Sequence, residues 1–223
     1  MKNMDVKKLR KMIDHTMLKP DCSPEIFKDF CLKAMEYKFE CVAILPNMVK
    51  NAKDILGGTD VKICAAIGFP EGIIPIQLKM IEIEDAIQNG CQELDMVINL
   101  AEVKFHNYKF LEKEIKEFRT NTKSYTAKII IEASILTKEE ISDLTKISCE
   151  NEIDYIKTST GFKGKVATIE DVKTIKSNIF GKTKIKAAGG IKNLQNALEM
   201  IEAGASRLGT SNGVKIVNEF LKN

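Results

Sequence analysis

Apolar and polar positions along the chain alternate between two periods. Short runs rich in β-branched and apolar residues recur, and longer amphipathic stretches separate them. This alternation is typical of a parallel sheet whose strands are connected by helices. Eight runs predict strands, at residues 13–17, 41–45, 62–67, 93–98, 128–132, 153–157, 183–187 and 206–209.

Helix starts and apolar stripes fill the stretches between these runs. Ser23-Pro24 predicts an N-cap followed by a first-turn proline, and residues 137–140 (Thr-Lys-Glu-Glu) predict a capping box. A helix before the fourth strand should end near Gly90 and pack on the sheet. Its apolar face is formed by Ile76, Met80, Ile83 and Ile87.

Eight strands in strict alternation with helices favour closure into a barrel. We therefore predict an α/β fold, a (β/α)8 TIM barrel, as a single domain over residues 1–223 with a short N-terminal helix. A length of 223 residues lies within the range of such barrels, and no Pro/Gly/Ser-rich linker divides the series. An open doubly wound sheet is the alternative, but the glycine fingerprint of dinucleotide binding is absent after the first strands.

Composition narrows the class of protein. A hydrophobic content of 44% with 29% charged residues is typical of a globular chain with a sizeable core. The formal charge of +3 comes from intermixed basic and acidic residues, which gives no support to nucleic-acid or membrane binding. The first ten residues lack the apolar centre of a signal peptide, and no apolar run reaches the length of a membrane span. We expect a soluble, intracellular protein.

Cysteine and histidine usage argues against metal binding. The six cysteines are scattered without a C-x-x-C pair, and only His15 and His106 could complete a site. Neither a disulfide framework nor a zinc site is predicted. We interpret His15 as structural and His106 as a surface residue.

The fourth predicted strand carries polar residues on one side. Leu94, Met96 and Ile98 alternate with Glu93, Asp95 and Asn99, so the apolar side should face the helices and the polar side the barrel interior. Branched apolar residues normally fill that interior, and polar groups there usually indicate a site. Asp95 is therefore a candidate catalytic residue, whereas Glu93 fits a structural carboxylate.

Two lysines occupy matched positions on neighbouring strands. Lys157 ends the sixth strand, where barrel enzymes place catalytic groups, and Lys186 lies at a similar height in the seventh. Repulsion between the two ammonium groups and partial desolvation should lower the pKa of at least one of them. We predict that Lys157 attacks a carbonyl, that Lys186 keeps it partly neutral and handles protons, and that Asp95 relays protons through water.

Small residues follow the last two strands and predict a phosphate site. Gly189, Gly190 and Gly209 allow the backbone to approach an anion closely, while Ser211 and Asn212 precede a helix N-terminus. In barrel enzymes this position commonly binds phosphate.

Several segments resemble those of the deoxyribose-phosphate aldolase family, over nearly the whole chain from Ile13 to Gly213. The resemblance is specific at residues 157–162 (Lys-Thr-Ser-Thr-Gly-Phe), similar to the family's Schiff-base motif, and at residues 186–191, similar to its second-lysine motif. The remaining matching segments are residues 13–20, 66–70, 93–99 and 208–211.

The resemblance implies reversible cleavage of 2-deoxy-D-ribose 5-phosphate to D-glyceraldehyde 3-phosphate and acetaldehyde. It implies that Lys157 forms the Schiff base and that Asp95 and Lys186 exchange protons, with no metal or organic cofactor. It also implies a small-molecule phosphosugar substrate with no nucleic-acid or membrane partner, a homo-oligomer (dimer or tetramer), and a cytoplasmic role in deoxynucleoside catabolism. The expected substrate contacts are Asp14, Thr16, Thr158, Gly161, Gly189, Gly190, Gly209, Ser211 and Asn212.

The chain departs from the family pattern at several positions. Ala43 and Leu45 stand where many relatives carry cysteine and asparagine, which predicts a more apolar pocket that is less prone to thiol adducts. Lys163 and Lys165 interrupt a usual glycine-rich run, either strengthening phosphate binding or remaining solvated. Ala188 replaces a frequent serine and removes one hydroxyl beside Gly189.

Three other functions compete with this interpretation. Another Schiff-base aldolase or transaldolase would share the Lys157 chemistry but use different donor contacts. A catalytically silent phosphosugar-binding barrel is disfavoured because Lys157, Lys186 and Asp95 occur together. A triosephosphate-isomerase-like enzyme is weaker, since no suitable glutamate follows the sixth strand.

Overall fold

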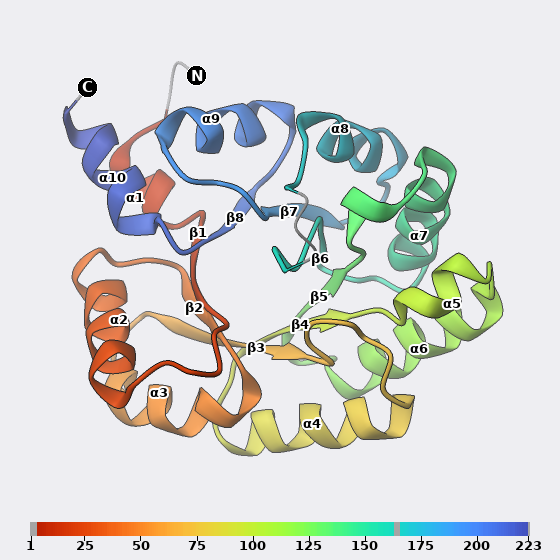
Figure 1. The fold of residues 1–223 in the computed structure, drawn as a ribbon, viewed down its shortest axis with the longest axis horizontal. Coiled ribbons are helices and arrows are strands. Elements are labelled where there is room, and N and C mark those ends of the chain that lie inside the picture. Colours follow the sequence, from red (N-terminus) through yellow and green to blue (C-terminus); the bar gives the residue numbers. More distant parts are fainter. Residues whose placement is uncertain (1–3, 163–165, 223) are drawn as a thin grey trace.

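The computed structural model describes residues 4–162 and 166–222, and the predicted roles of Lys163 and Lys165 lie outside these ranges. Eight parallel strands form a closed barrel in which β8 pairs with β1 (Figure 1). The predicted (β/α)8 fold is confirmed, and the open doubly wound sheet is wrong. The strands are β1 (Ile13–Met17), β2 (Cys41–Ile44), β3 (Lys62–Ile67), β4 (Glu93–Val97), β5 (Thr126–Ile130), β6 (Tyr155–Lys157), β7 (Lys184–Ala188) and β8 (Arg207–Thr210).

Helices surround the barrel, and the expected short N-terminal helix is α1 (Val6–Arg10), capped by Asp5 (Figure 1). Each crossover between consecutive strands carries at least one helix. The longer helices are α2 (Pro24–Glu36), α3 (Val49–Leu56), α4 (Ile76–Gln88), α6 (Tyr108–Asn121), α7 (Lys138–Glu150), α8 (Ile169–Asn178), α9 (Leu194–Ala203) and α10 (Gly213–Lys222). Short turns of helix complete the connections at α5 (Leu100–Lys104), η1 (Pro46–Met48) and η2 (Ala133–Ile135).

The predicted helix starts agree with the structure. Ser23 accepts a hydrogen bond from the backbone N–H of Ile26 and Pro24 begins α2. Thr137 and Glu140 form a reciprocal capping box at the start of α7, with bonds of 3.2 and 2.8 Å. Each cap satisfies backbone donors that a helix start would otherwise leave unpaired.

The predicted apolar face of α4 is only partly right. Ile76 and Ile83 are buried as expected, whereas Met80 and Ile87 are half-buried at the edge of the core. The buried line instead runs through Lys79, which is fully buried and ion-paired to Glu114 of α6 at 2.7 Å. Because Lys79 also donates to the carbonyl of Val97 at 2.7 Å, its charge is satisfied between α4, α6 and the end of β4.

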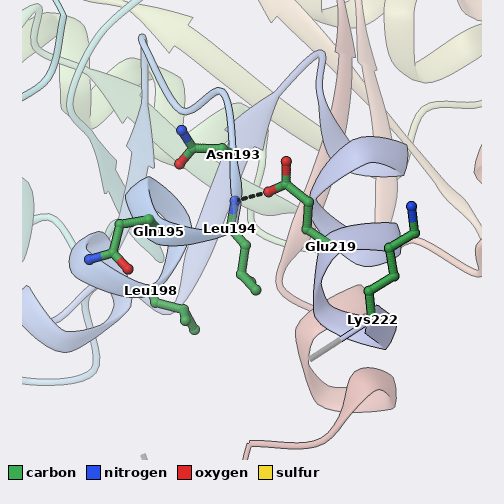
Figure 2. Close-up of a pocket in the computed structure, with 6 residues that line it drawn as sticks. All are labelled: Asn193, Leu194, Gln195, Leu198, Glu219 and Lys222. Carbon is green, nitrogen blue, oxygen red and sulfur yellow. Dashed lines mark hydrogen bonds between the residues drawn. The ribbon is translucent and has the colours of Figure 1, made fainter.

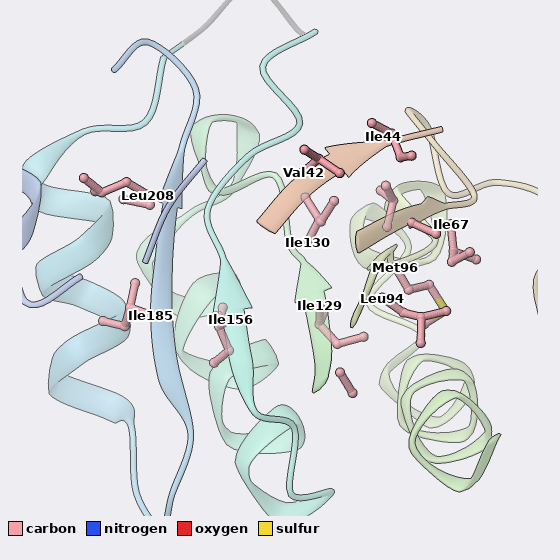
Figure 3. Packing of buried hydrophobic residues seen from close by; sticks show 14 of the residues in the cluster. Val42, Ile44, Ile67, Leu94, Met96, Ile129, Ile130, Ile156, Ile185 and Leu208 are labelled. Atoms are coloured by element: carbon pink, nitrogen blue, oxygen red, sulfur yellow. The ribbon is translucent and has the colours of Figure 1, made fainter. Parts of the chain in front are cut away.

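The main hydrophobic core lies between the barrel and its helices (Figure 3). Outward-facing strand residues such as Leu94, Ile129 and Ile156 are fully buried there. The alternation along β4 therefore runs as predicted, with apolar side chains outside the barrel and Glu93 and Asp95 inside. The barrel interior therefore contains buried polar and charged side chains.

No helix among the described residues is long and apolar enough to cross a membrane.

Candidate active site

Two lysines and one carboxylate meet inside the barrel. Lys157 at the end of β6 pairs directly in register with Lys186 of β7. Their Nζ atoms lie 2.9 and 2.6 Å from the same oxygen, Oδ2 of Asp95 on β4. The three residues predicted from separate strands are thus brought together, and all three are almost completely buried.

A third lysine, which the sequence analysis missed, holds the other side of this carboxylate. Lys128 of β5 donates to Asp95 Oδ1 at 2.8 Å, and the Cys64 thiol donates to the same oxygen at 3.0 Å. Asp95 is therefore bonded on both oxygens and cannot rotate freely. The available signal was a lysine between Ala127 and Ile129, a charge inside an otherwise apolar strand.

Beneath these groups, Asp14, Glu93 and Arg207 form an ion network that we call the floor network. The Arg207 guanidinium donates to Asp14 Oδ1 at 2.6 Å and to Glu93 Oε2 at 2.9 Å. Lys186 lies 2.5 Å from the other oxygen of Asp14. Asp14, expected as a substrate contact, is thus fully buried among cations at the amino-terminal half of the barrel.

The floor network includes donor atoms that could in principle hold a metal ion. Ligand atoms of Asp14, Cys41 and Glu93 lie within 4.8 Å of one another. Arg207 is bonded to all three residues, including Cys41 Sγ at 3.4 Å. Its guanidinium supplies the positive charge that a bound cation would otherwise provide.

Electrostatics distinguishes the two central lysines. Burial lowers the pKa of Lys157, and the neighbouring Lys186 ammonium lowers it further, against the opposing effect of Asp95. Burial also disfavours charge on Lys186, but Asp14 and Asp95 outweigh it and raise the pKa of Lys186. At neutral pH the two amines thus differ in their readiness to lose a proton, with Lys157 the more readily deprotonated.

The carboxylate between them stays ionised. Burial alone would raise the pKa of Asp95, but Lys128, Lys157 and Lys186 together hold it well below its usual value. Asp95 therefore accepts hydrogen bonds from all three amines.

The loop after Lys157 is fixed to both neighbouring strands. The Thr158 hydroxyl donates to the Ala188 carbonyl and accepts from the Ala188 N–H, both at 2.9 Å, so it is occupied by β7. Thr160 donates to Glu132 from its N–H and hydroxyl, at 3.0 and 2.5 Å. Glu132 is left-handed with φ 54°, which sequence reasoning missed by extending the fifth strand to this residue.

One hydroxyl in this loop is left over. Ser159 is completely buried, and its Oγ has no hydrogen-bond partner among the described residues. Buried polar groups are rarely left unpaired.

Of the predicted phosphate residues, Gly189 and Gly190 follow β7, Gly209 lies within β8, and Ser211 and Asn212 follow β8. Gly190 has φ 82°, and a Cβ there would approach Val166 to 2.5 Å. A Cβ at Gly209 would lie 2.9 Å from the Ala188 side chain and 3.2 Å from Cε of Lys186. Glycine is therefore required for close packing against Val166 at position 190 and against Ala188 and Lys186 at position 209.

The other expected substrate contacts differ in exposure and in their hydrogen bonds. Gly161 and Ser211 are exposed, and Asn212 donates its N–H to the Thr210 hydroxyl just before α10. The Thr16 hydroxyl donates to the carbonyl of Asp14 on its own strand at 2.9 Å.

The pocket wall around Ala43, where the chain departs from the family pattern, is only partly apolar. Ala43 is buried beside Cys41 and Cys64, as a substitution of this kind predicts. Cys64, however, places a thiol against Asp95. The lower tendency toward thiol adducts therefore stays a prediction, with Cys64 as the thiol that tests it.

The structure also has surface hollows away from the lysines. One, of about 450 Å³, lies between α9 and α10 and is lined by Asn193, Leu194, Gln195, Leu198, Glu219 and Lys222 (Figure 2). Glu219 there accepts a hydrogen bond from the Leu194 N–H at 2.7 Å and so caps the start of α9. This hollow contains none of the buried amines.

Both histidines have the surroundings that the sequence predicts, His15 a structural one and His106 a surface one. His15 is buried and stacks on Phe30 with ring centroids 4.5 Å apart, outside the barrel interior. His106 is exposed in the connection between α5 and α6. Neither contacts the lysine cluster.

The fold and this cluster together define a barrel enzyme built around buried amines and a shared carboxylate inside the barrel, with Lys157 at the carboxyl end of β6. The family model described as DeoC/LacD family aldolase matches residues 8–219. The chain therefore belongs to this family and is an aldolase, a carbon–carbon lyase, as its motifs indicated.

Individual relatives agree with the family. A deoxyribose-phosphate aldolase of Aquifex aeolicus is 44% identical over 214 residues, covering 96% of this chain and 97% of the relative. A solved structure described as QR15, an aldolase, is 43% identical with a TM-score of 0.91, covering 96% of each chain. The deoxyribose phosphate aldolase of Aeropyrum pernix, described as a unique tetrameric structure, is 27% identical with a TM-score of 0.88, covering 97% of this chain and 92% of that one.

Proposed function

We propose that the chain reversibly cleaves 2-deoxy-D-ribose 5-phosphate to D-glyceraldehyde 3-phosphate and acetaldehyde through a Schiff base on Lys157. The observation that carries this proposal is the buried Lys157 amine, with its lowered pKa, 2.9 Å from Asp95 and in register with a charged Lys186. An amine attacks a carbonyl only when neutral, and burial beside a cation favours the neutral form.

The charge balance of the barrel interior supports a neutral Lys157. Three carboxylates, Asp14, Glu93 and Asp95, lie buried there with four cationic groups. If Lys157 gives up its proton, three cations face three carboxylates. Buried charge is stable when it is paired, so the deprotonated amine leaves the better-balanced interior. The four cationic side chains are Lys128, Lys157, Lys186 and Arg207.

In the proposed reaction, Lys157 Nζ attacks C1 of the open-chain aldehyde. The addition product loses water and leaves an iminium whose positive charge lies beside Asp95. The C3 hydroxyl then gives up its proton through a water to Asp95, and the C2–C3 bond breaks toward the iminium. Glyceraldehyde 3-phosphate departs, and the enamine that remains on Lys157 takes a proton at C2 before water releases acetaldehyde.

Lys186 has a supporting role in this scheme. Its raised pKa keeps it protonated, so it can donate a hydrogen bond to a developing alkoxide. Because its Nζ is bonded to Asp95, it can also return a proton to the enamine. It also keeps the pKa of Lys157 low in the free enzyme.

The phosphate of the substrate is proposed to bind at the loop after β7 and the carboxyl end of β8. Gly189, Gly190 and Gly209 permit close approach of backbone N–H groups, and α10 begins directly after Asn212. Ser211 is exposed at this position and offers a hydroxyl.

The chain is further proposed to assemble with copies of itself, as a dimer or tetramer. The relative from Aeropyrum pernix is described as tetrameric, and its fold superposes with a TM-score of 0.88. Sedimentation velocity would measure the mass directly, and a purely monomeric species at micromolar concentration would contradict this proposal.

Borohydride trapping tests the proposed reaction. Protein incubated with 2-deoxyribose 5-phosphate is reduced, digested and analysed by mass spectrometry, alongside Lys157→Met and the exposed control Lys116→Met. We expect an adduct on Lys157 in the wild type and the control, and none in Lys157→Met. An adduct on another lysine would overturn the site but keep the class of reaction. Adducts only with a ketose phosphate would favour a different aldolase, and binding without any adduct would favour a silent barrel.

A further inference from the structure

A second hollow opens at the opposite end of the barrel from Lys157. Its volume is about 730 Å³, and it lies between α1, the end of α2 and the turn from α3 to β3. These segments directly precede β1, β2 and β3, so the hollow is at the amino ends of the strands. It is separate from the aldolase site, which uses the carboxyl ends.

Cationic side chains dominate the lining of this hollow. Lys7, Arg10 and Lys11 come from α1 and its C-cap, and Lys38 follows α2, whereas Asp60 is the acidic residue that lines it. Among the described residues, the ion pairs include only one for these four cations, a contact of 3.7 Å between Lys11 and Glu40.

Arg10 carries the most direct sign of a missing partner. Its Nε is buried from solvent and has no acceptor within the part of the chain that the structure describes. The other two arginines, Arg119 and Arg207, both reach carboxylates, at 3.1 and 2.6 Å. A buried charged donor without an acceptor is costly. Because Arg10 lines the hollow, an anion that enters it would place negative charge beside this guanidinium.

The chemistry of the lining selects the kind of acceptor. A guanidinium presents its donors in a planar fork that matches phosphate oxygens, and several ammonium groups around one hollow favour more than one negative charge. A volume of about 730 Å³ lies within the usual range of small-molecule sites. The half-buried Met35 and the buried Val61 add an apolar edge.

We propose that this hollow binds an oligophosphate, a chain of two or three phosphate groups, either free or as part of a nucleotide. The site is independent of the proposed aldolase reaction, because none of its residues takes part in that reaction. It would give the enzyme a means of responding to phosphorylated metabolites other than its substrate.

Isothermal titration calorimetry with inorganic triphosphate tests the proposal. The wild type is compared with Arg10→Gln/Lys38→Gln and with the charge-matched control Lys28→Gln/Lys50→Gln, whose residues are exposed and lie outside the hollow. We expect one triphosphate per chain for the wild type and the control, and binding weakened about tenfold or more in the first variant. Arg10→Lys, which keeps the charge and loses the fork, should weaken binding by a smaller factor.

Three results would overturn the site: no binding to the wild type, equal weakening in both double variants, or no weakening in either. Circular dichroism melting of each variant ensures that lost binding is not lost folding. A parallel titration with ATP identifies the source of the phosphate chain. Tighter binding of ATP than of triphosphate supports a nucleotide, and equal binding supports the phosphate chain alone.

Discussion

At the scale of single residues, one carboxylate organises the site. Asp95 accepts hydrogen bonds from Lys128, Lys157 and Lys186, on both of its oxygens. The surroundings of the three amines differ in burial and in neighbouring charge. Chemically identical lysine side chains therefore have different pKa values.

Removing the proposed nucleophile, Lys157, should abolish turnover without unfolding the barrel. For Lys157→Met we expect the rate of 2-deoxyribose 5-phosphate cleavage to fall about 10³-fold or more, since no other described amine has Lys157's combination of position and lowered pKa. A coupled assay for glyceraldehyde 3-phosphate measures the rate. Full activity in a folded variant would contradict the assignment.

Removing Lys186 should move the pH dependence of the reactive amine. The Lys186 ammonium lowers the pKa of Lys157, so Lys186→Met should raise it and shift the pH at which Lys157 becomes nucleophilic upward. The measurement is the rate of borohydride trapping as a function of pH, which reports Schiff-base formation and not later proton transfers. Lys104→Met, an exposed lysine of α5, serves as control. An unchanged profile in Lys186→Met would show that the two amines are not coupled.

At the scale of elements, caps and tight turns hold the strands that carry these residues. The capping box of α7 lies directly after the turn that contains Glu132, and Glu132 in turn fixes the loop after Lys157. Local sequence signals of this kind are short-range, which is why they could be recognised before the structure was known.

Loss of the α7 cap should cost stability and spare chemistry. Thr137→Ala removes the acceptor of the Glu140 N–H, and we expect the free energy of unfolding to fall by about 1 kcal/mol. Urea denaturation measures it. Thr120→Ala, at an exposed position within α6, is the matched substitution and should change stability by less. Equal losses of unfolding free energy in the two variants would show that the cap contributes no more than an ordinary threonine hydroxyl.

A methyl group at Gly190 should disturb the proposed phosphate loop. Gly190→Ala places a Cβ 2.5 Å from Val166 at φ 82°, whereas Gly181→Ala at φ 68° meets no atom within 4 Å. Both variants carry backbone strain, and only the first adds a collision. We expect a larger rise in KM for 2-deoxyribose 5-phosphate, about tenfold, in Gly190→Ala. Similar KM values in the two variants would place the phosphate elsewhere.

Sequence alone predicted most elements and three of the central residues. Strands and capped helices follow from local periodicity. Lys157 and Lys186 were recognised because Lys157 ends one apolar run and Lys186 lies at a similar height in the next. Lys128 and Arg207 were missed because a single charged residue in a short strand resembles a solvated side chain until the barrel closes. Lys79 was missed for the same reason on a helix, since its partner Glu114 is 35 residues away.

At the scale of the whole molecule, closure of the barrel joins residues that are far apart in the chain. Pairing of β1 with β8 places Asp14 beside Arg207, which are separated by 193 residues. The floor network thus exists only in the closed barrel, and its ion pairs form when the last strand is in place.

Stability should fall as the pH falls below neutrality, in part because of His15. Burial, aided by Lys33, lowers the pKa of His15 from 6.5 to about 4, so the folded chain keeps it neutral while the unfolded chain becomes protonated. The unfolded state binds more protons between these values, so stability is complete above about 6.5 and declines toward about 4, by roughly 2–4 kcal/mol. Urea denaturation at pH 7 and pH 5 measures the slope.

Substitution of each histidine separates this effect from other titrations. His15→Leu should flatten the pH dependence of the unfolding free energy, whereas His106→Leu, at an exposed position, should leave it as in the wild type. An unaltered slope in His15→Leu would mean that other groups cause the acid sensitivity.

The separation of the floor network from the loops at the mouth has a consequence for evolution and engineering. The groups that set the acidity of the central amines, Asp95, Lys128 and Asp14, all lie on strands, whereas the proposed phosphate contacts lie at and beyond the ends of β7 and β8. If Lys157 is the nucleophile as proposed, loop replacement would change the substrate range while the reactive amine is inherited unchanged. As a scaffold for making carbon–carbon bonds, the barrel would permit diversification of its entrance without rebuilding its reactive centre.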